Sequence, residues 1–343
     1  MSLIMRKKLL LLTALCGFLG TFVSNDLKAQ DPIFTQFYAN PLYLNPAFAG
    51  SHRCPRIVMN YRDQWPAIQG TYVTQSFSYD QHVGPIAGGL GILVTNDDAG
   101  QGTLKTTRAS LIYSYFLPVT KEFSIKLGVE ATYYQKSLDW DKLFFGDQID
   151  QQLGFIRQTN EDKAGVVSRQ VVDFSAGVLG YSRSFYIGAA AHHLTEPGEG
   201  FNGPQQGSPL PMKITAHMGA IIPTGGGRGR AGRRKRRRGK DALPASSISP
   251  NVLYRRQQDF QELFLGVYVT KGPIVGGLWY RNADAFIALV GLQFQNFRFG
   301  YSYDVTVSKL AANSAGSHEV SASFLFNCRP PRKKFTPVSC PSF

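Results

Sequence analysis

The chain has 343 residues, enough for one large domain or two ordinary ones, and only 17% of them are charged. Aromatic residues reach 13% and glycines number 35, a composition that favours an all-β chain over a helical one. The net charge of +14 comes largely from one run, 228–240, which holds nine basic residues. The rest of the mature chain is nearly neutral, which excludes a uniformly basic protein.

Residues 1–29 predict a cleaved secretion signal. A basic start, 6–8, precedes an apolar stretch, 9–23, and the small residue Ala29 stands before the predicted cut. The apolar stretch is short for a transmembrane anchor, and a bulky Leu15 in front of the first cysteine argues against lipidation. Later in the chain no apolar run is long enough for a membrane helix, so a closed β-barrel is the remaining way to span a bilayer.

Residues 30–54 form an aromatic, proline-rich segment that contains "YANPLYLNPAFAG". Its Asn-Pro pairs, at Asn40 and Asn45, argue against a helix or a central strand. Its aromatic residues argue against a solvated linker, because burying each one contributes roughly 1.5–3 kcal/mol. We expect this segment to plug a lumen, or to dock at the periplasmic rim or on a partner. The interaction candidates in it are Phe34, Phe37, Tyr38, Tyr43 and Phe48.

Alternation of apolar and polar residues predicts about fourteen strands within 55–327. Several exceed ten residues, and a tilted barrel strand needs about nine to eleven residues to cross a bilayer. An even number of such strands predicts a transmembrane antiparallel β-barrel in a bacterial outer membrane. A soluble secreted β-sandwich is the alternative, and the strand lengths argue against it. The predicted strands are 55–65, 71–80, 86–95, 103–117, 122–138, 170–182, 184–195, 212–222, 247–257, 261–270, 273–281, 284–295, 297–309 and 317–327.

Two of these strands, 122–138 and 297–309, show most clearly one apolar face and one face of small or charged residues. This pattern is typical of lipid-facing and lumen-facing sides. The charged residues of the second face are Lys126, Glu130, Arg298 and Asp304. We expect them to form a solvated or salt-bridged barrel interior, and a catalytic or transport cluster is the less favoured alternative.

The predicted connections alternate in length. Short turns in the periplasm and longer loops outside are typical of outer-membrane barrels, so we expect the short set and both chain termini in the periplasm. The short set is 81–85, 118–121, 182–184, 271–272 and residue 296, and the longer set includes 139–169, 196–211 and 310–316.

One connection, 224–247, breaks this rule, because it is long, Gly-rich and strongly basic yet falls on the periplasmic side. Such a self-repelling segment is expected to be disordered. The export signal argues against a nucleic-acid partner, so we expect contact with an acidic periplasmic partner, cell-wall material or anionic lipid, or no essential role. Its interaction candidates are Arg233, Arg234, Lys235, Arg236, Arg237 and Arg238.

No motif for catalysis, nucleotide binding or a metal is present, so neither an enzyme nor a cofactor is expected. The adjacent histidines His192 and His193 should point to opposite faces of a strand, where they cannot chelate together. The basic periplasmic tail 328–343 contains Cys328 and Cys340, which are a possible disulfide. Cys54 is a rival partner for Cys328, since the first and last strands adjoin in a closed barrel.

Several ordered stretches resemble the PorP/SprF family, from about Asp31 to Cys328. They are "DPIFTQFYANPLYLNPAFAG" (31–50), "YRDQWP" (61–66), "VVDFSAGVLGYS" and "FYIGAAAHHLTEP" (171–197), "ISPNVLYRRQ" (248–257), "GGLWYRNADAFIALVG" (276–291) and "GYSYDVTVSKLAANSAGSHEVS" (300–321).

The resemblance implies a non-catalytic outer-membrane barrel of the type IX secretion and gliding machinery. Such proteins support export or surface attachment of cargo that bears a C-terminal signal, such as an adhesin or a secreted enzyme. The implied partners are other type IX components, a periplasmic peptidoglycan-associated protein, and the cargo or surface adhesin, within outer-membrane lipid. The alternative function is a pore for small solutes, and a soluble secreted adhesin is a further, less favoured one.

Overall fold

A computed structural model describes residues 31–326, apart from 53, 69, 71, 121, 151, 153, 157, 161–164, 202–208, 225–245, 283, 295 and 308–314. The chain divides into two units, and the second, Pro32–Phe343, holds all the structure described below. The predicted signal peptide, almost all of the basic insertion and the C-terminal tail lie outside the described residues.

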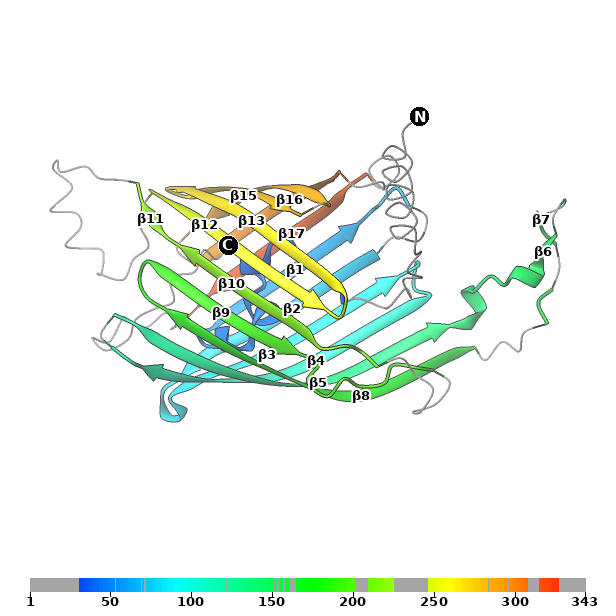
Figure 1. Ribbon diagram of the computed structural model, residues 1–343, viewed down its shortest axis with the longest axis horizontal. Helices are drawn as coiled ribbons and strands as arrows, with labels where there is room; N and C mark the ends of the chain where they lie inside the picture. The colour runs from blue at the N-terminus through cyan, green and yellow to red at the C-terminus, as the bar shows by residue number, and fades with distance from the viewer. Residues whose placement is uncertain are drawn as a thin grey trace, which may run out of the picture. The chain divides into compact units, whose positions relative to one another are not determined.

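Strands dominate the described residues, as the alternating pattern predicts, and fourteen of them form one ring (Figure 1). A short strand, β11 (Ile222–Pro223), extends the pairing of β12. The ring strands are β1 (Arg56–Gln64), β2 (Tyr72–Val83), β3 (Gly88–Ala99), β4 (Leu104–Pro118), β5 (Ser124–Asp139), β8 (Val166–Tyr181), β9 (Phe185–His192), β10 (Lys213–Ala220), β12 (Ser246–Gln257), β13 (Phe260–Lys271), β14 (Ile274–Arg281), β15 (Ala285–Gln293), β16 (Phe297–Thr306) and β17 (Ser317–Leu325).

The ring is closed. Each strand pairs antiparallel with its neighbour along the chain, and β1 pairs with β17 from Arg56↔Leu325 to Gln64↔Ser317. The pairing of β10 with β12 bridges the basic insertion. Closure leaves no strand edge within the ring, which is what a membrane-spanning sheet requires. The predicted fold, a transmembrane antiparallel barrel of about fourteen strands, is therefore confirmed.

The two faces of the barrel follow the sequence alternation. On β5, Leu127, Val129 and Tyr133 are 50%, 56% and 45% exposed, whereas Lys126 and Glu130 are 1% and 7% exposed. The same contrast of an apolar outer face and a polar inner face recurs around the ring. A lipid-facing surface and a polar lumen account for this arrangement.

Connections gather at two ends, which we call the turn end and the loop end. The turn end, where β1 begins and β17 ends, has the short links 84–87, which include η3 (Gly84–Ile86), and 119–123, 182–184, 272–273 and 294–296, together with the insertion between β11 and β12. The loop end has the longer links 65–71, 140–165, 193–212 and 307–316. The loop 140–165 contains η4 (Trp140–Lys142), η5 (Gly146–Gln148), β6 (Ile149–Asp150) and β7 (Gly154–Phe155).

The length difference between the ends is weaker than the sequence predicts. The loop end also has three tight links, 100–103, 258–259 and 282–284. The link 258–259 turns in two residues because Gln258 takes a left-handed conformation with φ 56°, which two-residue hairpins need. Nothing in the residue types Gln and Asp announces this turn as an Asn-Gly pair would.

Candidate functional site

The segment before β1 lies in the barrel lumen as three single helical turns. They are η1 (Phe37–Ala39), α2 (Pro41–Leu44) and η2 (Pro46–Phe48). We expected no helix here because of the prolines, but Pro41 and Pro46 each stand at the first positions of a turn. There the missing N–H would have no partner within the helix, so proline is tolerated. Two prolines therefore limit the turns to one each and do not prevent them.

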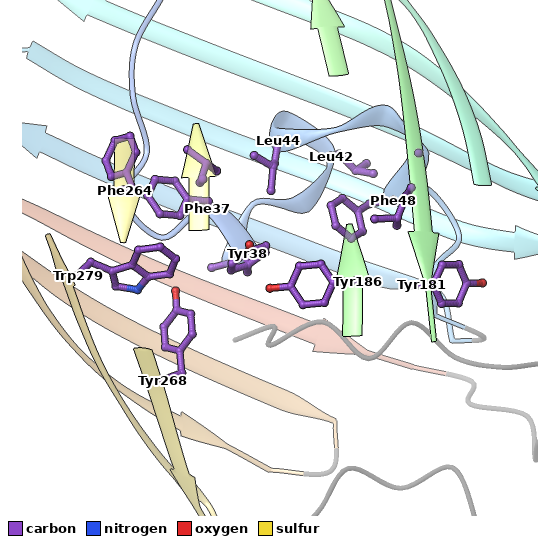
Figure 2. Packing of buried hydrophobic residues seen from close by; sticks show 14 of the residues in the cluster. Phe37, Tyr38, Leu42, Leu44, Phe48, Tyr181, Tyr186, Phe264, Tyr268 and Trp279 are labelled. Carbon is purple, nitrogen blue, oxygen red and sulfur yellow. The ribbon is translucent and has the colours of Figure 1, made fainter. Parts of the chain in front are cut away.

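Aromatic side chains of this segment form the core of the lumen (Figure 2). Phe37 packs edge-on against Phe264 and Trp279, with ring centroids 4.8 and 5.1 Å apart. Tyr38 does the same with Tyr186 at 5.5 Å. Edge-to-face pairs add to the energy of burial, so the segment and the inner wall stabilise each other. Of the candidates, Phe34, Phe37, Tyr38 and Phe48 are buried and Tyr43 is partly buried.

The two asparagines before the prolines fix the middle of the segment. The Asn45 side-chain oxygen accepts a hydrogen bond from the Ala47 amide at 2.9 Å, and so caps η2. Its amide nitrogen donates to the carbonyl oxygens of Val178 and Ala189, both at 3.1 Å. The Asn40 side chain donates to the Ser76 hydroxyl at 3.0 Å. Asparagine provides both a donor and an acceptor in one short side chain, and Asn45 uses both.

A buried carboxylate, Glu319 on β17, holds the start of the segment. It accepts hydrogen bonds from the Thr35 amide at 2.6 Å, the Thr35 hydroxyl at 2.8 Å and the Gln36 amide at 3.1 Å. Arg62 on β1 lies 3.3 Å from Glu319 and 2.9 Å from Asp304 on β16. Because all three ionic groups are at most 1% exposed, each depends on the others and on Thr35 to satisfy its charge.

The end of the segment is held at the turn end of the barrel. The Gly50 amide donates to the Asp80 carboxylate at 2.8 Å, and Asp80 also pairs with Arg56 at 2.7 Å. The Ala49 carbonyl oxygen accepts from the Ser114 hydroxyl at 2.6 Å and from the Lys126 ammonium. Buried backbone groups of this irregular stretch are thus satisfied by side chains of the inner wall.

One glycine of the wall allows this close packing. A Cβ added at Gly128 on β5 would lie 2.3 Å from the Ala47 amide nitrogen and 2.4 Å from the Pro46 carbonyl carbon. Real Cβ atoms do not approach backbone so closely. The wall therefore has no side chain at the point where η2 lies against β5.

The segment runs along the lumen from the loop end to the turn end. Its first part is bonded to Glu319, two residues from the loop end of β17, and the Tyr43 hydroxyl donates to the Pro32 carbonyl at 2.6 Å. Tyr43 in turn lies under Lys213, the first residue of β10 at the loop end. Pro32 thus lies at the loop end, whereas we expected both termini of the mature chain on the turn-end side.

The four predicted lumen charges do not form one cluster. Lys126 bonds to the plug backbone at Ala49, as described above. Asp304 pairs with Arg62, and Glu130 accepts from Thr132 at 3.3 Å. Arg298 is partly buried near the turn end of β16. Sequence reasoning missed Arg62 and Glu319, although both lie in stretches, "YRDQWP" and "SHEVS", that were noted as similar to a family.

The two adjacent histidines contradict the prediction that they point to opposite faces. Both are buried, and their ring centroids lie 6.5 Å apart. His193 follows the end of β9 with a left-handed φ of 60°, which turns its side chain to the same side as His192. Its Nδ1 lies 2.6 Å from the Asp173 carboxylate. Among the described residues, no three His, Cys, Asp or Glu side chains form a metal site.

Two small cavities of about 30 Å³ each flank the segment in the described part of the lumen. One is lined by Phe34, Phe37 and Leu253 among others, the other by Tyr43 and Glu130 among others. Each has room for roughly one water molecule. Within the part of the chain that the structure describes, no helix is both long and apolar enough to cross a membrane.

Several predicted site residues fall outside the described residues: Arg233, Arg234, Lys235, Arg236, Arg237, Arg238, Cys328 and Cys340. Cys54 is disulfide-bonded. Beside it, the β1–β17 ladder continues one step past the strands, because the Phe326 amide donates to the Pro55 carbonyl at 3.1 Å. The pairing of the cysteines remains a prediction.

Solved structures with a similar arrangement of strands have low sequence identity to this chain. The toluene transporter TbuX of Ralstonia pickettii is 12% identical with a TM-score of 0.44, over 84% of this chain and 92% of that one. A Pseudomonas aeruginosa FadL homologue is 12% identical with a TM-score of 0.44, over 82% and 93%. The Acinetobacter baumannii protein Omp33 is 8% identical with a TM-score of 0.41, over 81% and 100%. No curated protein matches the chain.

The family comparison covers nearly the whole mature chain. The model of the type IX secretion system membrane protein PorP/SprF matches residues 26–324. This range includes the lumen segment, thirteen ring strands, all but the last residue of β17, and the long loops between the strands. The chain therefore belongs to the PorP/SprF family of type IX secretion system membrane proteins.

Proposed function

We propose that this chain is a plugged, non-catalytic barrel of the bacterial outer membrane that supports type IX export or surface attachment of cargo proteins bearing a C-terminal signal. The observation that carries this proposal is the burial of residues 32–51 in the lumen, where two cavities between described residues of the segment and the wall measure about 30 Å³ each. A barrel closed in this way offers surfaces for assembly and no route for solutes.

The two ends of the barrel would then serve different partners. With the turn end in the periplasm, the C-terminal tail 328–343 and the basic insertion 224–247 face periplasmic type IX components, including a peptidoglycan-associated protein. The insertion carries nine basic residues within 228–240. This positive charge favours binding to an acidic partner, cell-wall material or anionic lipid. Nucleic acid is not an expected partner, because the chain is exported. The loop end would face cargo or a surface adhesin.

A first experiment tests the secretion role. We expect deletion of the gene to remove either one surface adhesin or many proteins sharing a C-terminal sorting domain from the surface and medium proteome. An unchanged set of exported proteins, together with altered uptake of small solutes, would contradict the proposal and favour the alternative of a pore.

A second experiment separates a platform from a pore on the purified protein. We expect the full chain to show no steady conductance in planar bilayers, and a variant lacking residues 31–51 to conduct or to fail to fold. If the variant folds and both proteins have equal conductance, residues 31–51 do not close the lumen.

A further inference from the structure

The loop 140–165, which we call the aromatic loop, lies at the loop end of the barrel and has a defined, hydrogen-bonded structure. Figure 1 shows its hairpin, β6 and β7, beyond the ends of β5 and β8. The Trp140 amide donates to the Gly165 carbonyl at 3.0 Å and closes the base of the loop. Further out, the Ile156 amide donates to the Gln148 carbonyl at 3.2 Å, and the Phe145 amide to the Gln148 side chain at 2.9 Å.

A single carboxylate ties the two sides of the loop together. Asp147 accepts from the Asn160 amide at 2.7 Å and from the Thr159 hydroxyl at 3.0 Å. These hydrogen bonds, first that of the Asn160 amide, lower the pKa of Asp147 below its usual value. At neutral pH the group is therefore charged and the tie is complete.

The outer part of the loop presents an apolar face to solvent. Phe144 and Phe155 are 78% and 62% exposed and lie together, with ring centroids 5.3 Å apart. Ile149, 48% exposed, is paired with Phe155 across the hairpin. We call Phe144, Ile149 and Phe155 the loop patch. Large apolar side chains held in water by a defined backbone indicate a binding surface, because aromatic anchors dominate protein interfaces.

The charge around the loop patch indicates what covers it. Residues 140–165 carry five acidic and three basic residues, in a chain whose net charge is +14. On the described part of the loop, Asp141, Lys142 and Asp147 are exposed. Lys142 pairs with Asp139 at 3.6 Å, which leaves Asp141 and Asp147 as the net charge there. A negatively charged surface is repelled by anionic lipid, whereas an apolar pocket with a basic rim complements it.

We propose that the aromatic loop is a docking element for a partner protein that offers an apolar pocket with a basic rim. The loop patch fills the pocket, and the acidic residues beside it face the rim. Only the location of the partner, outside the cell, rests on the proposed function. The preformed hairpin lowers the entropic penalty of binding, because little ordering is left to occur.

The test compares full-length tagged proteins expressed from the chromosome: wild type, the double variant F144S/F155S, and the matched control I156S. Ile156 is 58% exposed and follows β7 directly, but it is not one of the three side chains of the loop patch. Photo-crosslinking from position 144 in intact cells identifies the chain in contact. Its binding to the purified barrel is then measured for all three proteins at two salt concentrations.

We expect the double variant to bind this chain at least about tenfold more weakly, since two interface anchors are lost, and I156S to bind like wild type. Binding of the wild type should weaken at high salt, and the crosslinked peptide should contain Lys or Arg. Equal binding by all three proteins, or a crosslinked peptide with an acidic rim, would overturn the proposal.

Two further measurements distinguish the proposed partner protein from other occupants of the loop patch. If wild type but not F144S/F155S binds vesicles of phosphatidylethanolamine and phosphatidylglycerol, the patch is a lipid contact and the proposal fails. If the crosslink joins two copies and sedimentation shows a dimer that the variant loses, the occupant is a second copy, and again the proposal fails. Unchanged heat-modifiable migration of the variants controls for barrel folding. If F144S/F155S loses the partner while the set of exported proteins is unchanged, the aromatic loop is still a docking element. That result would contradict the proposed secretion role instead.

Discussion

Replacing Gly128 with alanine should loosen the lumen segment without changing the barrel wall. The added Cβ would lie 2.3 Å from the Ala47 amide nitrogen and 2.4 Å from the Pro46 carbonyl carbon, where ordinary contacts begin at 3.4 Å. The η2 turn must therefore withdraw by about 1 Å. Such a shift stretches the two 3.1 Å hydrogen bonds from Asn45 to strand carbonyls beyond bonding distance.

The magnitude follows from two contributions. Overpacking of this kind destabilises by about 1–3 kcal/mol, and the two lost hydrogen bonds contribute about 1 kcal/mol each. The segment should thus be held more weakly by about 3–5 kcal/mol, which is a hundredfold or more in the ratio of seated to displaced segment.

The assay is conductance of the reconstituted protein in planar bilayers, together with the midpoint of heat-modifiable unfolding in detergent. G128A should show openings that the wild type lacks and a lower midpoint. The matched control is G276A, also a strand glycine on the ring, where an added Cβ meets no atom within 4 Å. If G128A keeps the wild-type baseline and midpoint, the segment is not held as we argue. If G276A conducts equally, the effect is general to the wall.

Three other predictions concern the anchors and the seam. E319Q should lower the unfolding midpoint, because Arg62 loses one of its two carboxylate partners. Hydrogen bonds to a charged group contribute about 1.5–3 kcal/mol. A midpoint equal to that of wild type would show that Asp304 alone satisfies the Arg62 guanidinium. Burial, and then the surrounding positive charges, lower the pKa of His52 well below its usual 6.5. The folded state therefore binds fewer protons than the unfolded state, and stability should fall as pH drops below 6.5. H52Q should remove part of this acid sensitivity, and an unchanged pH profile of stability would refute this role of His52. Cys54, which is disulfide-bonded, should have Cys328 as its partner, because the Phe326 amide, two residues before Cys328 in the chain, donates to the Pro55 carbonyl beside Cys54. Mapping after non-reducing proteolysis would refute this by finding a Cys328–Cys340 peptide instead.

The ring of strands could be predicted from the sequence because a lipid-facing side and a lumen-facing side impose a period of two on every strand. The predicted range 122–138 corresponds to β5 (Ser124–Asp139), and 317–327 to β17 (Ser317–Leu325). The predicted strands 247–257 and 261–270 already leave a short link at Gln258, but its left-handed backbone was not predicted, because glutamine does not favour that conformation. Alternation in the sequence indicates which side chains are buried. Residue types indicate a turn only where the turn requires a particular residue, such as glycine or asparagine.

The interior of the barrel was harder to predict. The Thr35–Glu319 contact joins residues 284 positions apart, and no periodicity identifies which carboxylate meets which amide. His193 was misplaced because the strand alternation was extended one residue past the end of β9. The aromatic residues of the segment indicated burial, but the wall that receives them comes from β9, β13 and β14, which are remote in the sequence.

The anchoring of Thr35 has a consequence for movement within the membrane. The β1–β17 pairing is the seam where the chain's first and last strands meet, and a barrel that releases material sideways into the bilayer would part there. In this barrel Arg62 of β1 reaches across to Glu319 of β17 and Asp304 of β16, and Thr35 and Gln36 sit on the same carboxylate. Separating β1 from β17 here would leave these buried charges without their partners. It would also break the contacts that hold the start of the segment, so the pairing of the first and last strands and the seating of the segment depend on the same carboxylate.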